Sequence, residues 1–205
     1  MKGEQKKQPN RKMLDWRCGL VEPYLDRNDT VLDIGAGTGW VAKRLSERKG
    51  CQITLVDVLD CNETELPLHI YDGETLPYAS KTFDVALLVF VLHHTLNHEQ
   101  MLREAARVAR RAVIVVEDTP ANPFERFVEW FWDSVLSIEH RFFAPHNYRR
   151  MSGWRELFRD LGLKLAREDR IKPFFPFYYT KAVFVLDTAA QRAKEKQAAA
   201  TSRAF

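Results

Sequence analysis

Gly35, Gly37 and Gly39 occupy alternate positions directly after a short apolar run. Glycine is favoured where the backbone needs a positive φ or must let a ligand approach closely. At a strand-to-helix junction, such a loop and the helix N-terminus can hold a nucleotide-like ligand. Asp33 stands two residues before the first glycine, where its carboxylate would face that ligand. The pattern predicts a cofactor-binding loop, although a purely structural glycine turn would use the same residues.

Two further acidic residues follow at positions typical of ligand contacts in open α/β sheets. Asp57 comes near the end of the apolar run 52–58, about twenty residues beyond the first glycine, where a carboxylate can accept hydrogen bonds from two ribose hydroxyls. Asp72 follows the next short apolar run, 68–71. The alternative for Asp57 is an aspartate that only caps a loop.

Two motifs carry a resemblance to a known family. The order Asp-x-Gly-x-Gly-x-Gly from Asp33 resembles the first motif of class I S-adenosylmethionine (SAM) dependent methyltransferases. It departs from the dinucleotide pattern Gly-x-Gly-x-x-Gly because its third glycine comes one residue early. The passage from Asp72 to Asp84 resembles the Asp-Ala-Glu-x-Leu-Pro-Phe signature of the type 11 methyltransferases. The resemblance covers about residues 14–187 and is strongest over 31–94.

The resemblance implies SAM as the cofactor and S-adenosylhomocysteine as its product. Asp33 and the glycines would hold the amino acid end of SAM, Asp57 its ribose, and Asp72 its adenine amino group. The complete set of expected cofactor contacts is Asp33, Gly35, Ala36, Gly37, Gly39, Asp57, Val58, Asp72, Gly73, Glu74 and Val89.

Histidines follow the strand expected over 83–90, at the sheet edge where such folds hold their ligands. The family has a similar Leu-His-His there. Imidazole suits a general base because its pKa lies near 7. Methyl transfer often needs only proximity and orientation, however, and one histidine of such a pair is often a core residue. The candidate bases or positioning groups are His93, His94, His140, His146 and Tyr148, and no metal-ligand spacing is present.

These residues need a sheet to bring them together. The resemblance implies a Rossmann-like α/β fold with a seven-stranded, mostly parallel sheet in the order 3-2-1-4-5-7-6, its last strand antiparallel, and helices on both faces. Apolar runs and helical periodicity are the basis for the individual elements, with Ser152 as a helix N-cap. Strands are predicted over 31–34, 52–58, 68–71, 83–90, 112–117, 163–167 and 181–187, and helices over 13–25, 40–49, 97–108 and 153–161.

The segment 120–150 is unusually aromatic. Phe124, Phe127 and Phe131 recur at helical spacing, which predicts a helix whose apolar stripe mostly packs on the sheet. In this fold the segment would also shape the acceptor pocket, so its aromatic surplus favours an acceptor with an apolar or planar part. Acidic residues argue against a membrane-surface helix, since anionic lipid favours Lys and Arg. These acidic residues are Glu125, Glu129 and Asp133.

Composition places few other constraints on the chain. Its 205 residues fit one methyltransferase domain over 13–188, with a disordered lead-in over 1–12 and a frayed or disordered tail over 189–205. A net charge of +3 without a basic stripe does not favour nucleic acid. Three irregularly spaced cysteines, no secretory pattern and no apolar run long enough to span a bilayer predict a cytoplasmic protein.

The function that we expect is methyl transfer from SAM to oxygen, nitrogen or carbon of a small molecule, by a monomer or homodimer. One alternative is a SAM-binding, non-catalytic partner subunit of a larger complex, because the aromatic segment can equally form a protein interface. Another is a nicotinamide-dependent oxidoreductase, which the glycine spacing disfavours. The Asn-Pro-Pro-Tyr signature of adenine amino methylation is absent.

Overall fold

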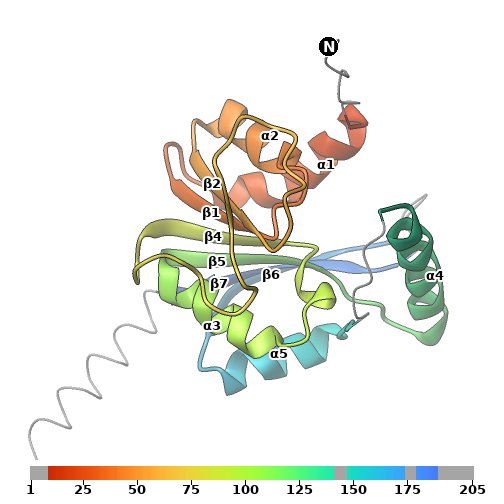
Figure 1. The fold of residues 1–205 in the computed structure, drawn as a ribbon. Helices are drawn as coiled ribbons and strands as arrows, with labels where there is room; N and C mark the ends of the chain where they lie inside the picture. The colour runs from red at the N-terminus through yellow and green to blue at the C-terminus, as the bar shows by residue number, and fades with distance from the viewer. Residues whose placement is uncertain (1–8, 141–146, 174–178, 189–205) are drawn as a thin grey trace, which may run out of the picture.

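The computed structural model describes residues 9–140, 147–173 and 179–188. Seven strands form one sheet in the order β3-β2-β1-β4-β5-β7-β6, as predicted (Figure 1). The strands are β1 (Thr30–Ile34), β2 (Gln52–Asp57), β3 (Leu68–Ile70), β4 (Phe83–Val89), β5 (Ala109–Asp118), β6 (Lys164–Ile171) and β7 (Lys181–Asp187).

The strand directions bring the predicted ligand contacts to one edge. β1 pairs in parallel with β2 and β4, and β4 pairs in parallel with β5. β7 runs antiparallel between β5 and β6, which confirms the expected last strand. Because the carboxyl ends of parallel strands meet at the same edge, residues that follow β1, β2, β4 and β5 converge there.

Helices cover both faces of the sheet (Figure 1). α1 and α2 pack with Val31 and Leu55 in one buried cluster, and α3 and α5 pack with Leu32 and Ile34 in the other. This division follows from the alternation of side chains along a strand. The helices are α1 (Arg11–Val21), η1 (Glu22–Tyr24), α2 (Trp40–Lys49), η2 (Leu92–His94), α3 (His98–Val108), α4 (Pro123–His140) and α5 (Met151–Asp160).

Several boundaries differ from those that the sequence predicts. α1 begins at Arg11 because the Asn10 side chain caps it, accepting from the N–H groups of Lys12 and Met13. α3 passes directly into β5, so this strand begins three residues before the expected start at Ala112. Ser152 is not an N-cap: α5 begins at Met151, with Arg150 at the N-cap position and no side-chain cap.

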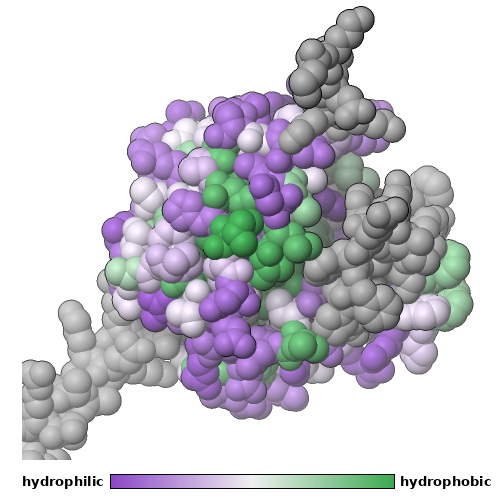
Figure 2. Space-filling model, viewed as in Figure 1, coloured by the Kyte–Doolittle hydropathy of each residue, from purple (hydrophilic) through white to green (hydrophobic). Residues whose placement is uncertain are grey.

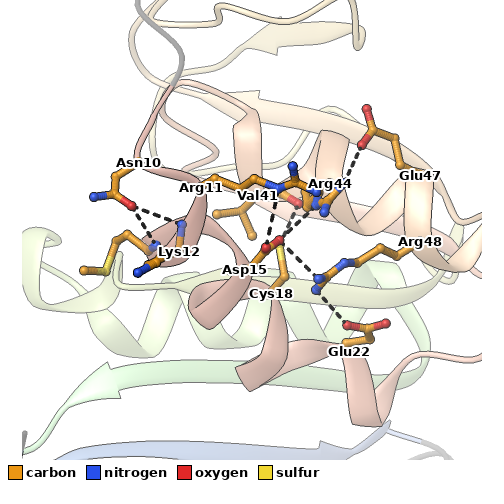
Figure 3. A network of polar contacts seen from close by, with 11 residues as sticks. Asn10, Arg11, Lys12, Asp15, Cys18, Glu22, Val41, Arg44, Glu47 and Arg48 are labelled. Atoms are coloured by element: carbon orange, nitrogen blue, oxygen red, sulfur yellow. Dashed lines mark hydrogen bonds and ion pairs between the residues drawn. The ribbon is translucent and has the colours of Figure 1, made fainter.

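Ion pairs fasten α1 to α2, the helix that begins after the glycine loop (Figure 3). Asp15 accepts a hydrogen bond from Arg44 at 3.0 Å and lies 3.1 Å from Arg48. Arg48 also contacts Glu22 at 3.2 Å. Exposed pairs of this kind contribute little individually, but a network that joins two helices restricts how one lies against the other. These contacts join the middle and the last turn of α2 to α1 and to η1.

Candidate functional site

The glycine loop between β1 and α2 adopts the backbone that its residues predict. Gly35, Gly37 and Gly39 have φ angles of 71°, 53° and 76°. A Cβ on Gly35 would lie 2.6 Å from Val91 Cγ2, and one on Gly39 would lie 2.7 Å from Asn62 Oδ1. A Cβ on Gly37 would meet no described atom within 4 Å. Packing therefore requires the outer two glycines, whereas the middle one faces open space of the kind that a ligand needs.

Asp33 lies beneath this loop with its carboxylate unpaired. It is 4 % exposed and accepts no hydrogen bond from the residues that the structure describes. Burial, together with the nearby charge of Asp57, raises the pKa of Asp33 to about 7. An ionised carboxylate buried without a partner is costly, so a cationic group of a ligand would be favoured there. The amino group of SAM is such a cation, and Asp33 fits it.

Asp57, at the carboxyl end of β2, holds the glycine loop from the other side. Its Oδ2 accepts from the Gly37 N–H at 2.8 Å, and its Oδ1 accepts from the N–H groups of Val58 and Leu59. The capping role weighed as the alternative is therefore present. A carboxylate has roughly four acceptor positions, and backbone N–H groups occupy three of them here. One position remains for a ribose hydroxyl, and a second ribose hydroxyl would have to share an oxygen lone pair with a backbone N–H.

The loop after β3 lies against the turn after β2. Asp72 Oδ1 accepts from the N–H groups of Thr75 and Glu74, and these bonds lower the pKa of Asp72. Gly73 has a φ of 83°, and a Cβ there would lie 3.2 Å from Val58 Cγ1. The partly exposed side chain of Val58 is thus next to the acidic loop. An apolar surface beside a carboxylate fits an adenine ring with its amino group.

The histidine pair follows β4 in η2, and its first member meets a carboxylate that the sequence reasoning missed. His93 Nδ1 lies 2.6 Å from Oε2 of Glu117, and both residues are buried. Glu117 Oε1 accepts from the N–H groups of Val91 and Leu92. Because a carboxylate can only accept, the Glu117 contact favours the tautomer in which His93 Nδ1 donates and Nε2 carries the imidazole lone pair. Catalytic bases are oriented by a third group in this way.

Tyr148 connects this pair to an open pocket. Its ring stacks on His93 with centroids 5.2 Å apart, and the Asn147 N–H donates to the His93 carbonyl. The His94 ring centroid lies 4.0 Å from that of His93. His146 and the side chain of His140 lie outside the described residues. A pocket of about 290 Å³ is lined by Pro123, Arg126, Phe127, Trp130 and Tyr148.

The expectation that the stripe of α4 packs on the sheet is wrong for its described aromatic residues, while the side chains beyond Phe131 lie outside the described part of the helix. Phe124, Phe127, Trp130 and Phe131 are 46–70 % exposed, whereas Glu125 and Glu129 are buried. Glu125 accepts a hydrogen bond from the Thr180 N–H. The negative charge of Glu129 lies near the Lys181 ammonium and acts to raise the pKa of Lys181. Buried donors and a buried cation need carboxylates, so they turn the acidic side of the helix inward.

A buried ion pair next to Glu117 was also missed. Lys181 Nζ lies 3.2 Å from Asp118 Oδ1 and 3.6 Å from the centroid of the Tyr179 ring. Burial lowers the pKa of Lys181 and raises that of Asp118, and each partner opposes the shift of the other. No sequence motif marks this pair, because it joins two strands that are far apart along the chain.

Neither a candidate metal site nor a candidate membrane-spanning helix occurs among the described residues. In the ranges 9–140, 147–173 and 179–188, no group of three or more His, Cys, Asp or Glu side chains is placed to hold a metal ion. In the same ranges, no helix has both the length and the apolar character needed to cross a bilayer.

Comparison with known sequences gives a family and several relatives. Residues 6–168 match the family model described as "Methyltransferase domain". The uncharacterized protein MJ1252 of Methanocaldococcus jannaschii is 31 % identical over 118 residues, which cover 57 % of this chain and 46 % of that protein. A demethylmenaquinone methyltransferase of Thermotoga maritima is 33 % identical over 119 residues, 52 % of each chain. The chain spans about half the length of the curated relatives that it matches.

Solved structures share the fold at low identity. A chain from the complex of the Haloferax volcanii Trm112 methyltransferase activator has a TM-score of 0.68 and 18 % identity, with 86 % of this chain and 90 % of that chain covered. The [4+2]-cyclase SpnF has a TM-score of 0.67 and 14 % identity, with 91 % and 84 % covered. At such identities these likenesses establish the fold alone.

Proposed function

Because this chain belongs to the methyltransferase domain family, whose cofactor is SAM, we propose that it transfers the methyl group of SAM to carbon of a quinol-type aromatic ring. The main support for the cofactor site is the buried carboxylate of Asp33, which has no hydrogen-bond partner among the described residues and lies near the open space at Gly37. The acceptor class rests on the relatives. Several are demethylmenaquinone methyltransferases, and one from Hahella chejuensis is a ubiquinone/menaquinone biosynthesis C-methyltransferase, 30 % identical over 112 residues.

Different residues at the sheet edge contact different parts of the cofactor. Asp33 pairs with its amino group, and the open backbone at Gly37 allows its amino acid end to approach. Asp57 accepts from the ribose, while Asp72 and the exposed part of Val58 contact the adenine. SAM supplies an electrophilic methyl group on a sulfonium.

The acceptor side consists of the aromatic pocket and the His93–Glu117 pair. Phe127, Trp130 and Tyr148 offer ring surfaces for a planar acceptor. His93 Nε2 takes the proton of a ring hydroxyl, which makes the ring carbon more nucleophilic. The carbon bonds to the methyl group as the sulfonium S–CH₃ bond breaks, and it then loses its own hydrogen as a proton, which restores the aromatic ring. Glu117 stabilises the imidazolium that forms, because its carboxylate remains bonded to Nδ1. Methylation at oxygen or nitrogen would use the same base.

A labelled-methyl assay tests this proposal. The chain is incubated with methyl-labelled SAM and 1,4-naphthohydroquinone, kept reduced, and the ring-methylated product and S-adenosylhomocysteine are quantified. His93→Asn is the matched variant, since its amide N–H can still donate to Glu117 while the base is removed. We expect its kcat to fall by about 10²–10⁴-fold with unchanged S-adenosylhomocysteine affinity. Equal turnover in the variant would remove His93 from the mechanism, and no turnover of this acceptor by cofactor-binding protein would reject the acceptor class.

A non-catalytic partner subunit is the second candidate. It is favoured by the exposed aromatic face of α4, which can equally form a protein interface. Gel filtration combined with methyl release by the isolated chain separates the two candidates. Turnover by the isolated chain supports the enzyme, whereas binding of SAM without methyl release supports the subunit.

A further inference from the structure

In the first turns of α4, aromatic side chains face outward and acidic side chains face inward. Phe124, Phe127, Trp130 and Phe131, the aromatic face, point outward and are 46–70 % exposed. The carboxylate side chains of the same turns are buried, Glu129 to 1 % exposure. Figure 2 shows hydrophobic residues at the right edge of the view, where Figure 1 places α4. A surface helix ordinarily has the opposite arrangement, with its apolar stripe against the core.

Specific hydrogen bonds fix this orientation. Asn122 caps the helix by accepting from the Glu125 N–H at 2.9 Å. The Glu125 carboxylate accepts from the N–H groups of Ala121 at 3.0 Å and Thr180 at 2.9 Å. Turning the aromatic face toward the sheet would break the bond from Thr180, the one that reaches outside the helix start, and leave that buried N–H without its acceptor. The outward aromatic face is therefore a specified feature of the fold.

Among the described side chains of α4, the exposed charge beside the aromatic face is cationic. The acidic residues of the first turns are withdrawn into the protein, so Arg126 is the charged side chain of residues 123–131 that stays exposed beside the rings. Arg126, Phe127 and Trp130 also line the pocket with Tyr148, and the exposed Arg149 and Arg150 follow Tyr148 directly. Exposed Phe and Trp rings together with arginines are typical of protein surfaces that insert into the headgroup region of an anionic bilayer.

We propose that the aromatic face of α4 docks on an anionic lipid surface. The rings enter the boundary between headgroups and acyl chains, while the arginines stay at the level of the phosphates. Of the acidic residues that argued against this role from the sequence, Glu125 and Glu129 do not oppose it, because they lie on the inner side of the helix; the side chain of Asp133 lies outside the described residues. Phe127 and Trp130 also line the pocket proposed for the acceptor, so their lipid contacts are made by the exposed parts of the rings, whereas Phe124 and Phe131 are not among the pocket lining.

Vesicle co-sedimentation tests the docking. The whole chain is mixed with vesicles of phosphatidylcholine alone and with vesicles that also contain phosphatidylglycerol, at low and raised salt. We expect binding to the anionic vesicles, weaker at raised salt because the charges are screened. The double variant Phe124→Ser, Phe127→Ser should bind at least roughly tenfold more weakly, since two rings no longer leave water. Ile70→Ser, which removes an exposed aliphatic side chain from β3, is the matched control and should bind as the wild type does.

Three results would overturn the proposal: no binding to either vesicle, binding that the double variant retains, or equal binding to both lipid compositions. Sedimentation velocity without lipid adds a further check. A dimer that the double variant abolishes would show that the face joins two copies of the chain instead. Titration with S-adenosylhomocysteine should give the same affinity for all three proteins, which separates this test from that of the proposed function.

Discussion

Asp33 links cofactor binding to pH. Its pKa of about 7 means that the carboxyl is largely protonated below neutrality and ionised above it. A cationic amino group pairs with the ionised form, so binding SAM must release a proton at pH 6. We expect the affinity to rise between pH 6 and pH 8. Titration calorimetry in two buffers of different ionisation enthalpy measures the proton release directly, and a flat affinity without proton release would exclude Asp33 as the amino group's partner.

The same carboxyl makes the stability of the unliganded protein fall with pH. Between pH 4 and pH 7 the folded protein holds a proton on Asp33 that the unfolded chain has lost, so stability decreases across this window and stays low above it. Asp33→Asn removes the effect. Denaturant unfolding should show the variant more stable than the wild type at pH 8, by at most about 4 kcal/mol, with the difference vanishing near pH 4. An unchanged difference across this range would contradict the raised pKa.

Glu117 is a positioning residue for His93. In Glu117→Gln the side-chain carbonyl would keep the bonds from Val91 and Leu92, which places the NH₂ group opposite His93 Nδ1. The imidazole must then accept at Nδ1, and Nε2 carries the proton instead of the lone pair. We expect kcat to fall by about 10²–10⁴-fold, the acidic limb of the pH–rate profile to change, and S-adenosylhomocysteine affinity to stay the same. Loss of folding with no such kinetic pattern would indicate a structural role alone.

At the level of elements, substitutions at Gly37 and Gly39 separate an effect on cofactor binding from an effect on the packing of the glycine loop. Gly37→Ala places its Cβ in open space, so it should cost only about 1–2 kcal/mol for the positive φ while obstructing the cofactor. Gly39→Ala adds a clash, with its Cβ 2.7 Å from Asn62 Oδ1 and 2.9 Å from Leu55 Cδ1. Gly39→Ala should therefore unfold at lower denaturant than Gly37→Ala. Calorimetry should show lost cofactor affinity in Gly37→Ala, and full affinity there would place the ligand elsewhere.

Element identities were predictable where local patterns decide them. α2 and its C-cap Gly50, with a φ of 72°, follow from helical periodicity and a terminal glycine. The orientation of α4 was not predictable, because the groups that attract Glu125 and Glu129 lie around Thr180 and Lys181, at the start of β7. Tertiary partners of this kind outweigh the apolar stripe, and they are invisible in a window of sequence around the helix.

At the level of the whole molecule, the sheet order explains which site residues were foreseeable. Acids at or just beyond the carboxyl ends of β1, β2 and β3 lie along one sheet edge, so Asp33, Asp57 and Asp72 could be grouped from the sequence. Pairs across strands depend on register. Asp118 and Lys181 are opposite each other only because β5 and β7 pair antiparallel with that alignment. The Glu117–His93 contact likewise depends on how β5 lies beside β4.

The central claim concerns the whole domain: the sheet edge beside the glycine loop binds SAM. The most direct measurement is isothermal titration of the purified chain with S-adenosylhomocysteine, alongside Asp57→Ala and the exposed control Asp160→Ala. We predict one site per chain, unchanged affinity in the control, and at least roughly tenfold weaker binding in Asp57→Ala, because charge-assisted hydrogen bonds to the ribose are lost. A folded wild-type chain that binds neither SAM nor S-adenosylhomocysteine would contradict the claim.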